Sequence, residues 1–288
     1  MKLTTLIPLA LKISIILIVF DLGLSASPRD AMYLFRKPGL LGRSLLSMNV
    51  IMPIFAASLA GAFDLRPAVK IALIALGVAP VPPILPKKQF KAGGQAPYVY
   101  GLLVTAALFA TVFIPLAMKL IGMLFSIPLH ESSAAIGKVV FLSVLAPLSA
   151  GILTRHYAPA LAKRLEKPSS FVGSLLLVVS VLPVLFTQWP VIRSLIGNGT
   201  LFATAAFIVA GLAVGHLLGG PYPENRTMLA LSTSSRHPGI ALAIATANFP
   251  EQKQVPAAVI LYLLVNATIS IPYLRWRRHT EVDAKVKV

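Results

Sequence analysis

The chain has 288 residues, of which 57% are hydrophobic and 12% are charged, and its mean hydropathy is +0.82. A soluble domain has about 25% charged residues, so this composition excludes an ordinary soluble protein and predicts an all-α protein that crosses a membrane several times, with membrane lipid as a partner. The net charge of +17 would point to nucleic acid in a soluble protein. Lys and Arg lie mainly in short loops, however, so we expect no nucleic-acid partner.

Apolar stretches predict nine membrane spans within a single membrane domain, residues 1–288. In chain order they cover residues 4–24, 39–61, 66–86, 96–124, 133–155, 169–188, 199–218, 227–249 and 254–274. The first stretch, followed by LSASP, could instead be a secretory signal peptide cleaved near Ala26. Lys12 interrupts its apolar part and no soluble mature protein would follow, so we interpret it as the first span.

The basic residues divide unevenly between the two sets of loops that these spans would create. One set, with the N-terminus, contains Lys2, Arg66, Arg193 and Lys253. The other set, with the C-terminal tail of residues 277–288, contains Arg29, Arg36, Lys37, Lys87, Lys88, Lys91, Arg155, Lys163, Arg164, Lys167, Arg226, Arg275, Arg277, Arg278, Lys285 and Lys287. Because cytoplasmic loops carry the excess of Lys and Arg, we expect the C-terminus in the cytoplasm and the N-terminus outside, in a bacterial inner membrane.

The third predicted span contains the stretch GVAPVPPILPKK, Gly77 to Lys88, which has prolines at 80, 82, 83 and 86. Each proline lacks the backbone N–H of a regular helix, so this segment must unwind. Pro80 lies about 21 Å along the helix from Arg66 at 1.5 Å per residue, short of the ~30 Å hydrocarbon core. We therefore expect the break inside the membrane, where freed carbonyl groups can hold a ligand. Alternatively, the prolines only end the helix, and Lys87 and Lys88 anchor it at the interface.

The eighth predicted span contains a second interruption, SRHPG, in which Arg236 precedes His237, Pro238 and Gly239. Arg236 would lie near mid-membrane, where a charge costs roughly 2.5–3.5 kcal/mol on insertion scales, and this marks it as a functional candidate. We expect an anionic substrate as its partner; the alternative is a structural bridge to carbonyl groups. His237 could bind substrate or carry a proton, given its ordinary pKa of about 6.5, or be a hydrogen-bonded structural residue.

Two interrupted spans at corresponding positions of two halves predict an inverted-repeat secondary transporter. The first repeat is residues 1–124, which is one helix short, and the second is residues 133–276. The interrupted spans of the two repeats would cross near the membrane midplane.

Four stretches together resemble the bile acid:sodium symporter family over nearly the whole chain: FDLGLSASPRDAMYLFRKPGLLGRS, GVAPVPPILPKKQFKAGG, SRHPGIALAIATANF and LYLLVNATIS. The resemblance implies a panel domain of spans 1, 5 and 6 and a core domain of spans 2–4 and 7–9, with an organic anion bound between them near the crossing. The crossover backbone that it implies is Pro80, Val81, Pro82, Ser235, Pro238 and Gly239. The implied substrate-binding residues are Pro83, Arg236, His237 and Asn266.

The chain departs from the family at both places where the family binds sodium. Pro83, Leu85 and Pro86 lie where the family's first crossover has Thr, Ser and Asn. Ser232, Arg236 and His237 lie where its second crossover has Glu and a Gln-Asn pair. We therefore expect no metal site, and we interpret Lys87, Lys88 or Arg236 as a fixed charge in place of sodium.

These features predict a secondary active transporter of a small organic anion, of the carboxylate or sulfonate type, that uses alternating access at the crossed broken helices. We expect no enzymatic activity and no cofactor. The coupling ion is left open between sodium, a proton and none, and the substituted positions argue against sodium. The alternatives are an ordinary sodium:organic anion symporter and a non-transporting membrane sensor or scaffold.

Overall fold

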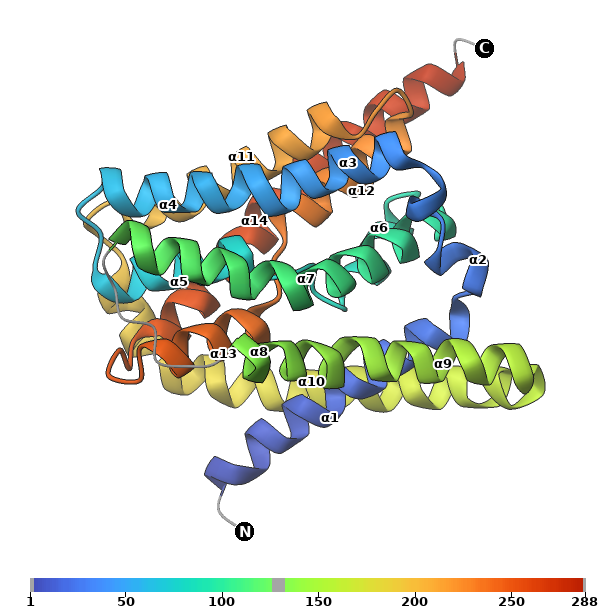
Figure 1. The fold of residues 1–288 in the computed structure, drawn as a ribbon, viewed down its shortest axis with the longest axis horizontal. Coiled ribbons are helices and arrows are strands. Elements are labelled where there is room, and N and C mark those ends of the chain that lie inside the picture. The colour runs from blue at the N-terminus through green and yellow to red at the C-terminus, as the bar shows by residue number, and fades with distance from the viewer. Residues whose placement is uncertain (1–2, 126–132, 287–288) are drawn as a thin grey trace.

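The computed structural model of the chain describes residues 3–125 and 133–286, and every regular element in these ranges is a helix (Figure 1). The α-helices are α1 (Leu3–Ser25), α2 (Pro28–Ala31), α3 (Pro38–Leu45), α4 (Met52–Ala62), α5 (Pro67–Val78), α6 (Leu85–Lys91), α7 (Ala96–Phe125), α8 (Ser133–Val140), α9 (Ala146–Tyr157), α10 (Pro159–Leu195), α11 (Thr200–Leu218), α12 (Pro223–Ser234), α13 (Pro238–Asn248) and α14 (Val255–Val286). A 3₁₀ turn covers Leu34–Arg36, and π-helical segments cover Leu46–Ile51 and Phe141–Leu145.

Within the described residues, seven helical stretches are long and apolar enough to cross a membrane. They are Leu6–Ser25, Pro38–Ala62, Ala96–Met123, Gly137–Tyr157, Pro159–Leu195, Thr200–Leu218 and Val255–Arg278. Each overlaps a predicted span. The other two predicted spans, 66–86 and 227–249, are divided into the short helices α5 and α6 and the short helices α12 and α13. The chain is thus an all-helical, polytopic membrane protein.

Two of the long stretches contain a π-helical segment directly before a proline. Leu46–Ile51 precedes α4, whose second residue is Pro53, and Phe141–Leu145 precedes α9, whose second residue is Pro147. A proline inside a helix lacks a donor and clashes with the preceding turn, and a wider turn accommodates both effects without ending the helix. The stretches Pro38–Ala62 and Ser133–Tyr157 therefore continue through their prolines.

The helix α10 is longer than predicted, because it begins at Pro159 instead of residue 169. Pro159 is the first helical residue, a position where a missing N–H costs nothing. The basic residues between 163 and 167 were interpreted as a loop, but they form the first turns of this helix. Large apolar side chains on its outer face, including Phe171 and Phe186, are 69% and 75% exposed and are suited to contact lipid.

The helices form two bundles (Figure 1). The helices α1, α9 and α10 pack against one another, and we call them the small bundle. The large bundle consists of α3 to α7 and α11 to α14. A Cβ atom added at Gly151 of α9 would lie 2.4 Å from the carbonyl oxygen of Phe20 on α1, so these two helices approach closely through their glycines.

An apolar cluster fills part of the contact between the two bundles. Val19 and Leu22 of α1 and Leu148 of α9 belong to it, together with Tyr100 and Leu103 of α7. All five side chains are buried. The spans that the family resemblance assigns to the panel correspond to the small bundle, with α8 leading into α9.

Arg277, near the membrane-distal part of α14, is packed against another helix. The predicted cytoplasmic tail starts at residue 277, yet α14 continues to Val286 and Arg277 is only 7% exposed. The Nε atom of Arg277 donates to Thr227 Oγ1 at 2.8 Å, and its second terminal nitrogen donates to the Pro223 carbonyl at 3.1 Å. Arg277 therefore holds α14 against the start of α12.

Candidate functional site

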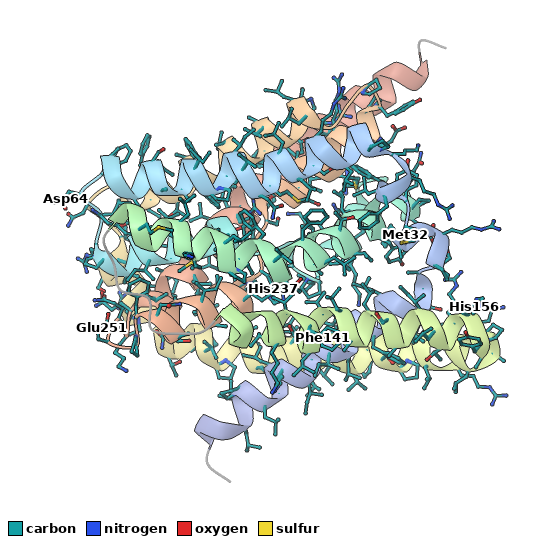
Figure 2. The ribbon with its side chains drawn as sticks, viewed as in Figure 1. Met32, Asp64, Phe141, His156, His237 and Glu251 are labelled. Carbon is teal, nitrogen blue, oxygen red and sulfur yellow. The ribbon has the colours of Figure 1, made fainter. Side chains whose placement is uncertain are left out.

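The two interrupted helices meet at their breaks. The helix α5 ends at Val78 and the chain becomes helical again at Leu85, while α12 ends at Ser234 and α13 begins at Pro238. The backbone N–H of His237 donates to the Pro80 carbonyl at 2.8 Å, which joins one break directly to the other. Figure 2 shows His237 in the middle of the molecule, between the end that carries Asp64 and Glu251 and the end that carries Met32 and His156.

Arg236 is buried in this crossing, with 2% of its surface exposed. One terminal nitrogen of its guanidinium donates to the Ala79 carbonyl at 3.2 Å, and the other donates to the Met48 carbonyl at 2.9 Å. Ala79 immediately follows α5, and carbonyl groups at a helix C-terminus lack intrahelical donors and carry partial negative charge. Arg236 therefore places a positive charge on the open end of the first broken helix. Its Nε atom has no hydrogen-bond partner among the described residues.

Tyr262 of α14 satisfies the backbone on both sides of the second break. Its hydroxyl donates to the Ser234 carbonyl at 2.7 Å and accepts a hydrogen bond from the Arg236 N–H at 2.8 Å. One turn further along α14, Asn266 Nδ2 donates to Ser235 Oγ at 3.2 Å. The sequence analysis identified Asn266 and missed Tyr262. The spacing of four residues, which places both side chains on one helix face, could have revealed it.

The neighbouring hydroxyl groups of α12 are also hydrogen-bonded inside the large bundle. Gln89 Nε2 on α6 donates to Ser232 Oγ and to the Met228 carbonyl, both at 2.9 Å. Thr233 Oγ1 lies 3.0 Å from Ser47 Oγ. The sequence analysis placed Ser232 at a sodium position of the family. Its Oγ atom already accepts a hydrogen bond from an N–H group.

His237 caps the second broken helix. Its Nδ1 atom accepts a hydrogen bond from the Ile240 N–H at 3.4 Å at the start of α13. The ring is 2% exposed, and its Nε2 atom has no partner among the described residues. A Cβ atom at Gly239 would lie 3.3 Å from the His237 ring and 4.0 Å from Ile15 on α1, so this helix start is close to the small bundle.

The remaining predicted site residues are those of the first break and the two lysines of α6. Pro80, Val81, Pro82 and Pro83 are buried in the first break. Lys87 lies on α6, and its Nζ atom donates to Ser170 Oγ of the small bundle at 2.7 Å. Lys88 is partly buried on the same helix. Of the three predicted fixed charges, Arg236 alone has hydrogen bonds to the crossing among the described residues.

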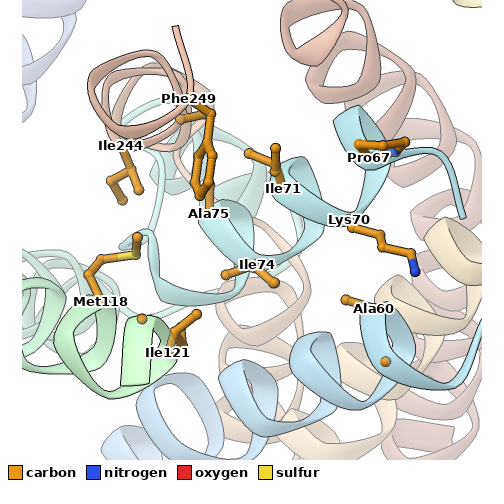
Figure 3. A pocket seen from close by; sticks show the side chains of 13 residues that line it. Ala60, Pro67, Lys70, Ile71, Ile74, Ala75, Met118, Ile121, Ile244 and Phe249 are labelled. Carbon is orange, nitrogen blue, oxygen red and sulfur yellow. The ribbon is translucent and has the colours of Figure 1, made fainter. Parts of the chain in front are cut away.

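A separate cavity lies at the other end of α5, between α4, α5, α7 and α13 (Figure 3). Its volume is about 360 Å³, and its lining includes Ile71, Ile74, Met118 and Phe249, with Lys70 as the charged member. None of the predicted site residues lines it. In the described residues there is also no group of three His, Asp or Glu side chains that could hold a metal ion.

Comparison with known proteins identifies the family. The model of the sodium bile acid symporter family matches residues 12–192. The chain is 25% identical over 258 residues to YocS of Bacillus subtilis (strain 168), described as an uncharacterized sodium-dependent transporter, and the match covers 84% of this chain and 75% of YocS. It is 24% identical over 237 residues to a sodium-dependent organic anion transporter of Rattus norvegicus, covering 81% of this chain and 63% of the rat protein. The family match covers more than half of the chain and agrees with the resemblance found in the sequence. The chain therefore belongs to the sodium bile acid symporter family and is a membrane transporter, not an enzyme.

Proposed function

We propose that this transporter carries a small organic anion of the carboxylate or sulfonate type across the inner membrane by alternating access, and that Arg236 replaces a co-transported sodium ion. The observation that carries the proposal is the guanidinium group of Arg236, which donates to the Met48 and Ala79 carbonyl oxygens. In transporters with broken helices, unwound carbonyls and helix C-terminal ends are the groups that coordinate sodium. Here a fixed cation of the chain has that role.

The donors around the crossing support the replacement. Sodium is a hard cation and requires several oxygen ligands. Arg236 donates to two carbonyl oxygens and Gln89 donates to Ser232 Oγ, so N–H groups already use these oxygens. Asp21 is the buried acidic side chain among the described residues. Its ion-pair partner is Lys87, which is not one of the groups that bond at the crossing.

The anion would bind between the two bundles, beside His237. The start of α13 carries the positive end of the helix dipole, and a helix N-terminus favours an anionic group. The unpartnered Nε2 atom of His237 supplies a further polar contact, and Pro83 and Asn266 complete the proposed lining. Because Arg236 is 2% exposed, it would act on the anion through its field instead of by direct contact. The organic anion described for the rat relative supports the substrate class.

The proposed transport cycle uses the predicted architecture. The seven long apolar helices would provide seven crossings, and the pairs α5–α6 and α12–α13 would provide two more. The repeats would be residues 1–124 and 133–276, with the small bundle as the panel and the large bundle as the core. The distribution of basic residues supports an N-terminus outside and a C-terminus in the cytoplasm.

An ordinary sodium:organic anion symporter is the second candidate, because both relatives are described as sodium-dependent. Thermal stability separates the two candidates without knowledge of the substrate. The purified protein is melted in sodium, potassium and choline chloride at matched ionic strength. We expect equal melting temperatures in the three salts. A sodium-specific rise that saturates at millimolar concentration would instead support the symporter.

The same measurement tests the substrate class. We expect some members of a panel of carboxylates and sulfonates to raise the melting temperature of the wild-type protein. In Arg236→Gln this stabilisation should be lost, because the fixed charge is absent. Uptake of the stabilising anion into proteoliposomes, in sodium and in choline, then shows whether the bound anion is transported.

A further inference from the structure

Asp21 and Lys87 form an ion pair that joins the two bundles. Lys87 Nζ lies 3.5 Å from Asp21 Oδ2. Asp21 is near the C-terminal end of α1 in the small bundle and is 6% exposed, whereas Lys87 is on α6 in the large bundle. An ion pair across a bundle contact must break whenever the bundles separate at that end.

The partners of Lys87 strengthen this assignment. Its Nζ atom also donates to Ser170 Oγ at 2.7 Å and to Ser174 Oγ at 3.4 Å, and both serines are on α10 of the small bundle. These three contacts of Lys87 therefore hold α6 against the small bundle. In the proposed topology this end of α1 and of α6 faces the cytoplasm, so the contacts close the cytoplasmic side.

An exposed acidic side chain lies at the same end of α1 as Asp21. Ser25, one helical turn after Asp21, donates from Oγ to Glu166 Oε1 at 2.9 Å, and Glu166 is exposed. The other charged or titratable groups around this end of α1 include Asp30 of α2, Lys87 of α6, Tyr100 of α7 and Arg155 of α9. Arg155 donates to the carbonyl groups of Leu24 and Ser25. In the proposed topology, cytoplasmic water therefore reaches Glu166, whose hydrogen-bond partner Ser25 is one helical turn from Asp21.

We propose that Asp21 binds a proton from the cytoplasm, and that its protonation releases the cytoplasmic contact between the bundles. This proposal rests on the proposed sodium-independent transport by alternating access and adds a cytoplasmic proton that controls it. One proton from cytoplasmic water binds a carboxylate oxygen of Asp21. Lys87 keeps its charge and turns toward water, to which its side chain is already 33% exposed.

The coupling follows from the burial of Asp21. The coupling requires that Asp21 stays covered by α1 and α10, which pack closely within the small bundle, while α6 moves away with Lys87. A carboxylate that stays buried after losing its cation is disfavoured in its charged form. The separated arrangement of the bundles therefore binds the proton more tightly than the closed one. By linkage, the proton shifts the population toward the separated arrangement by the same factor.

The absence of cysteine from the chain allows a direct test with a single introduced thiol. Leu103 is 1% exposed in the apolar cluster between α1, α7 and α9, so Leu103→Cys reports separation of the bundles. The rate of its alkylation by N-ethylmaleimide is measured in nanodiscs between pH 5.5 and 7.5. Each rate is divided by the rate for the denatured protein at the same pH, because thiol reactivity itself depends on pH.

We expect the normalised rate to increase on acidification, by up to about tenfold per pH unit for one linked proton. In Asp21→Asn the rate should be high and independent of pH. Asp64→Asn, which changes an exposed acid in another loop, should keep the wild-type response. A rate independent of pH in the wild-type background, or an unchanged response in Asp21→Asn, overturns the proposal.

Two further variants decide the matter if Asp21→Asn does not fold. Asp21→Glu keeps a titratable carboxylate and should keep the pH response. Lys87→Gln removes the cation and should raise the rate at pH 7.5 to the level that the wild-type background reaches in acid. An unchanged rate at pH 7.5 in Lys87→Gln contradicts the proposed contact.

The labelling is repeated in sodium chloride and in choline chloride, which separates this proposal from the proposed function. A sodium-specific change in rate contradicts sodium independence but leaves a pH response at Asp21 standing. Equal rates in both salts, without any pH response, leave sodium independence standing and contradict the proton site.

Discussion

The side chain of Tyr262 and the backbone of Arg236 are joined by a 2.8 Å hydrogen bond, in which the Arg236 N–H donates to the tyrosine hydroxyl. The same hydroxyl donates to the Ser234 carbonyl at 2.7 Å. A single oxygen of α14 thus replaces the backbone partners that the interrupted helix α12–α13 has lost. Backbone groups inside a membrane have no water to bond, so the break depends on this residue.

Tyr262→Phe should therefore destabilise the protein. Both backbone groups would remain buried and unsatisfied, at a cost of about 1–3 kcal/mol each. Melting of the purified variant measures the loss. Tyr157→Phe is the matched control, because Tyr157 is 79% exposed and its variant should melt like the wild type. Equal melting of the two variants would show that the Tyr262 hydroxyl does not support the break.

His237→Asn should separate the capping role of His237 from its proposed substrate contact. Asn is among the best N-cap residues, whereas replacement of a cap by Ala costs about 0.5–2 kcal/mol. We expect His237→Asn to melt near the wild type and His237→Ala to melt lower. Both should lose anion uptake if the ring contacts the substrate. Normal uptake by His237→Asn would leave His237 with a structural role only.

Gly151→Ala should weaken the small bundle. Its added Cβ would lie 2.4 Å from the Phe20 carbonyl oxygen, and overpacking of this kind costs about 1–3 kcal/mol. Gly42→Ala adds the same methyl group to α3, where nothing lies within 4 Å, and should instead stabilise by about 0.5–1 kcal/mol. Melting temperatures that move in opposite directions confirm the close contact, and a common direction contradicts it.

Arg277→Gln should destabilise the contact between α14 and α12. Hydrogen bonds made by charged groups contribute about 1.5–3 kcal/mol, and Arg277 donates to Thr227 and to the Pro223 carbonyl. Arg278→Gln is the control, since Arg278 is exposed on the same helix. If both variants melt alike, the contacts of Arg277 do not contribute to stability.

The positions of the helices and of both breaks could be predicted from the sequence because they depend on local properties. Long apolar stretches locate the helices, and the prolines from 80 to 86 cannot belong to one regular helix. Arg236 was also identifiable, since a charge in such a stretch is rare. The start of α10 was predicted ten residues late because basic residues near a membrane span resemble a loop.

The contacts of these residues could not be predicted, because they join segments far apart in the chain. Arg236 reaches Met48, 188 positions away, and Ala79, 157 positions away. The sequence analysis did not identify Asp21, and only the folded structure brings Lys87 of α6 to it. Hydropathy and proline positions carry no information about such pairs.

Arg236 is covalently part of the chain, which has an electrical consequence for the proposed transport. A co-transported sodium ion would be released after each crossing and would supply energy from its gradient, whereas an arginine stays in place and supplies none. One elementary charge crossing the membrane alone gains or loses about 2.3 kcal/mol per 100 mV. With the cytoplasm negative, a lone anion is driven outward. Uptake against this potential would therefore require a cation that travels with the anion.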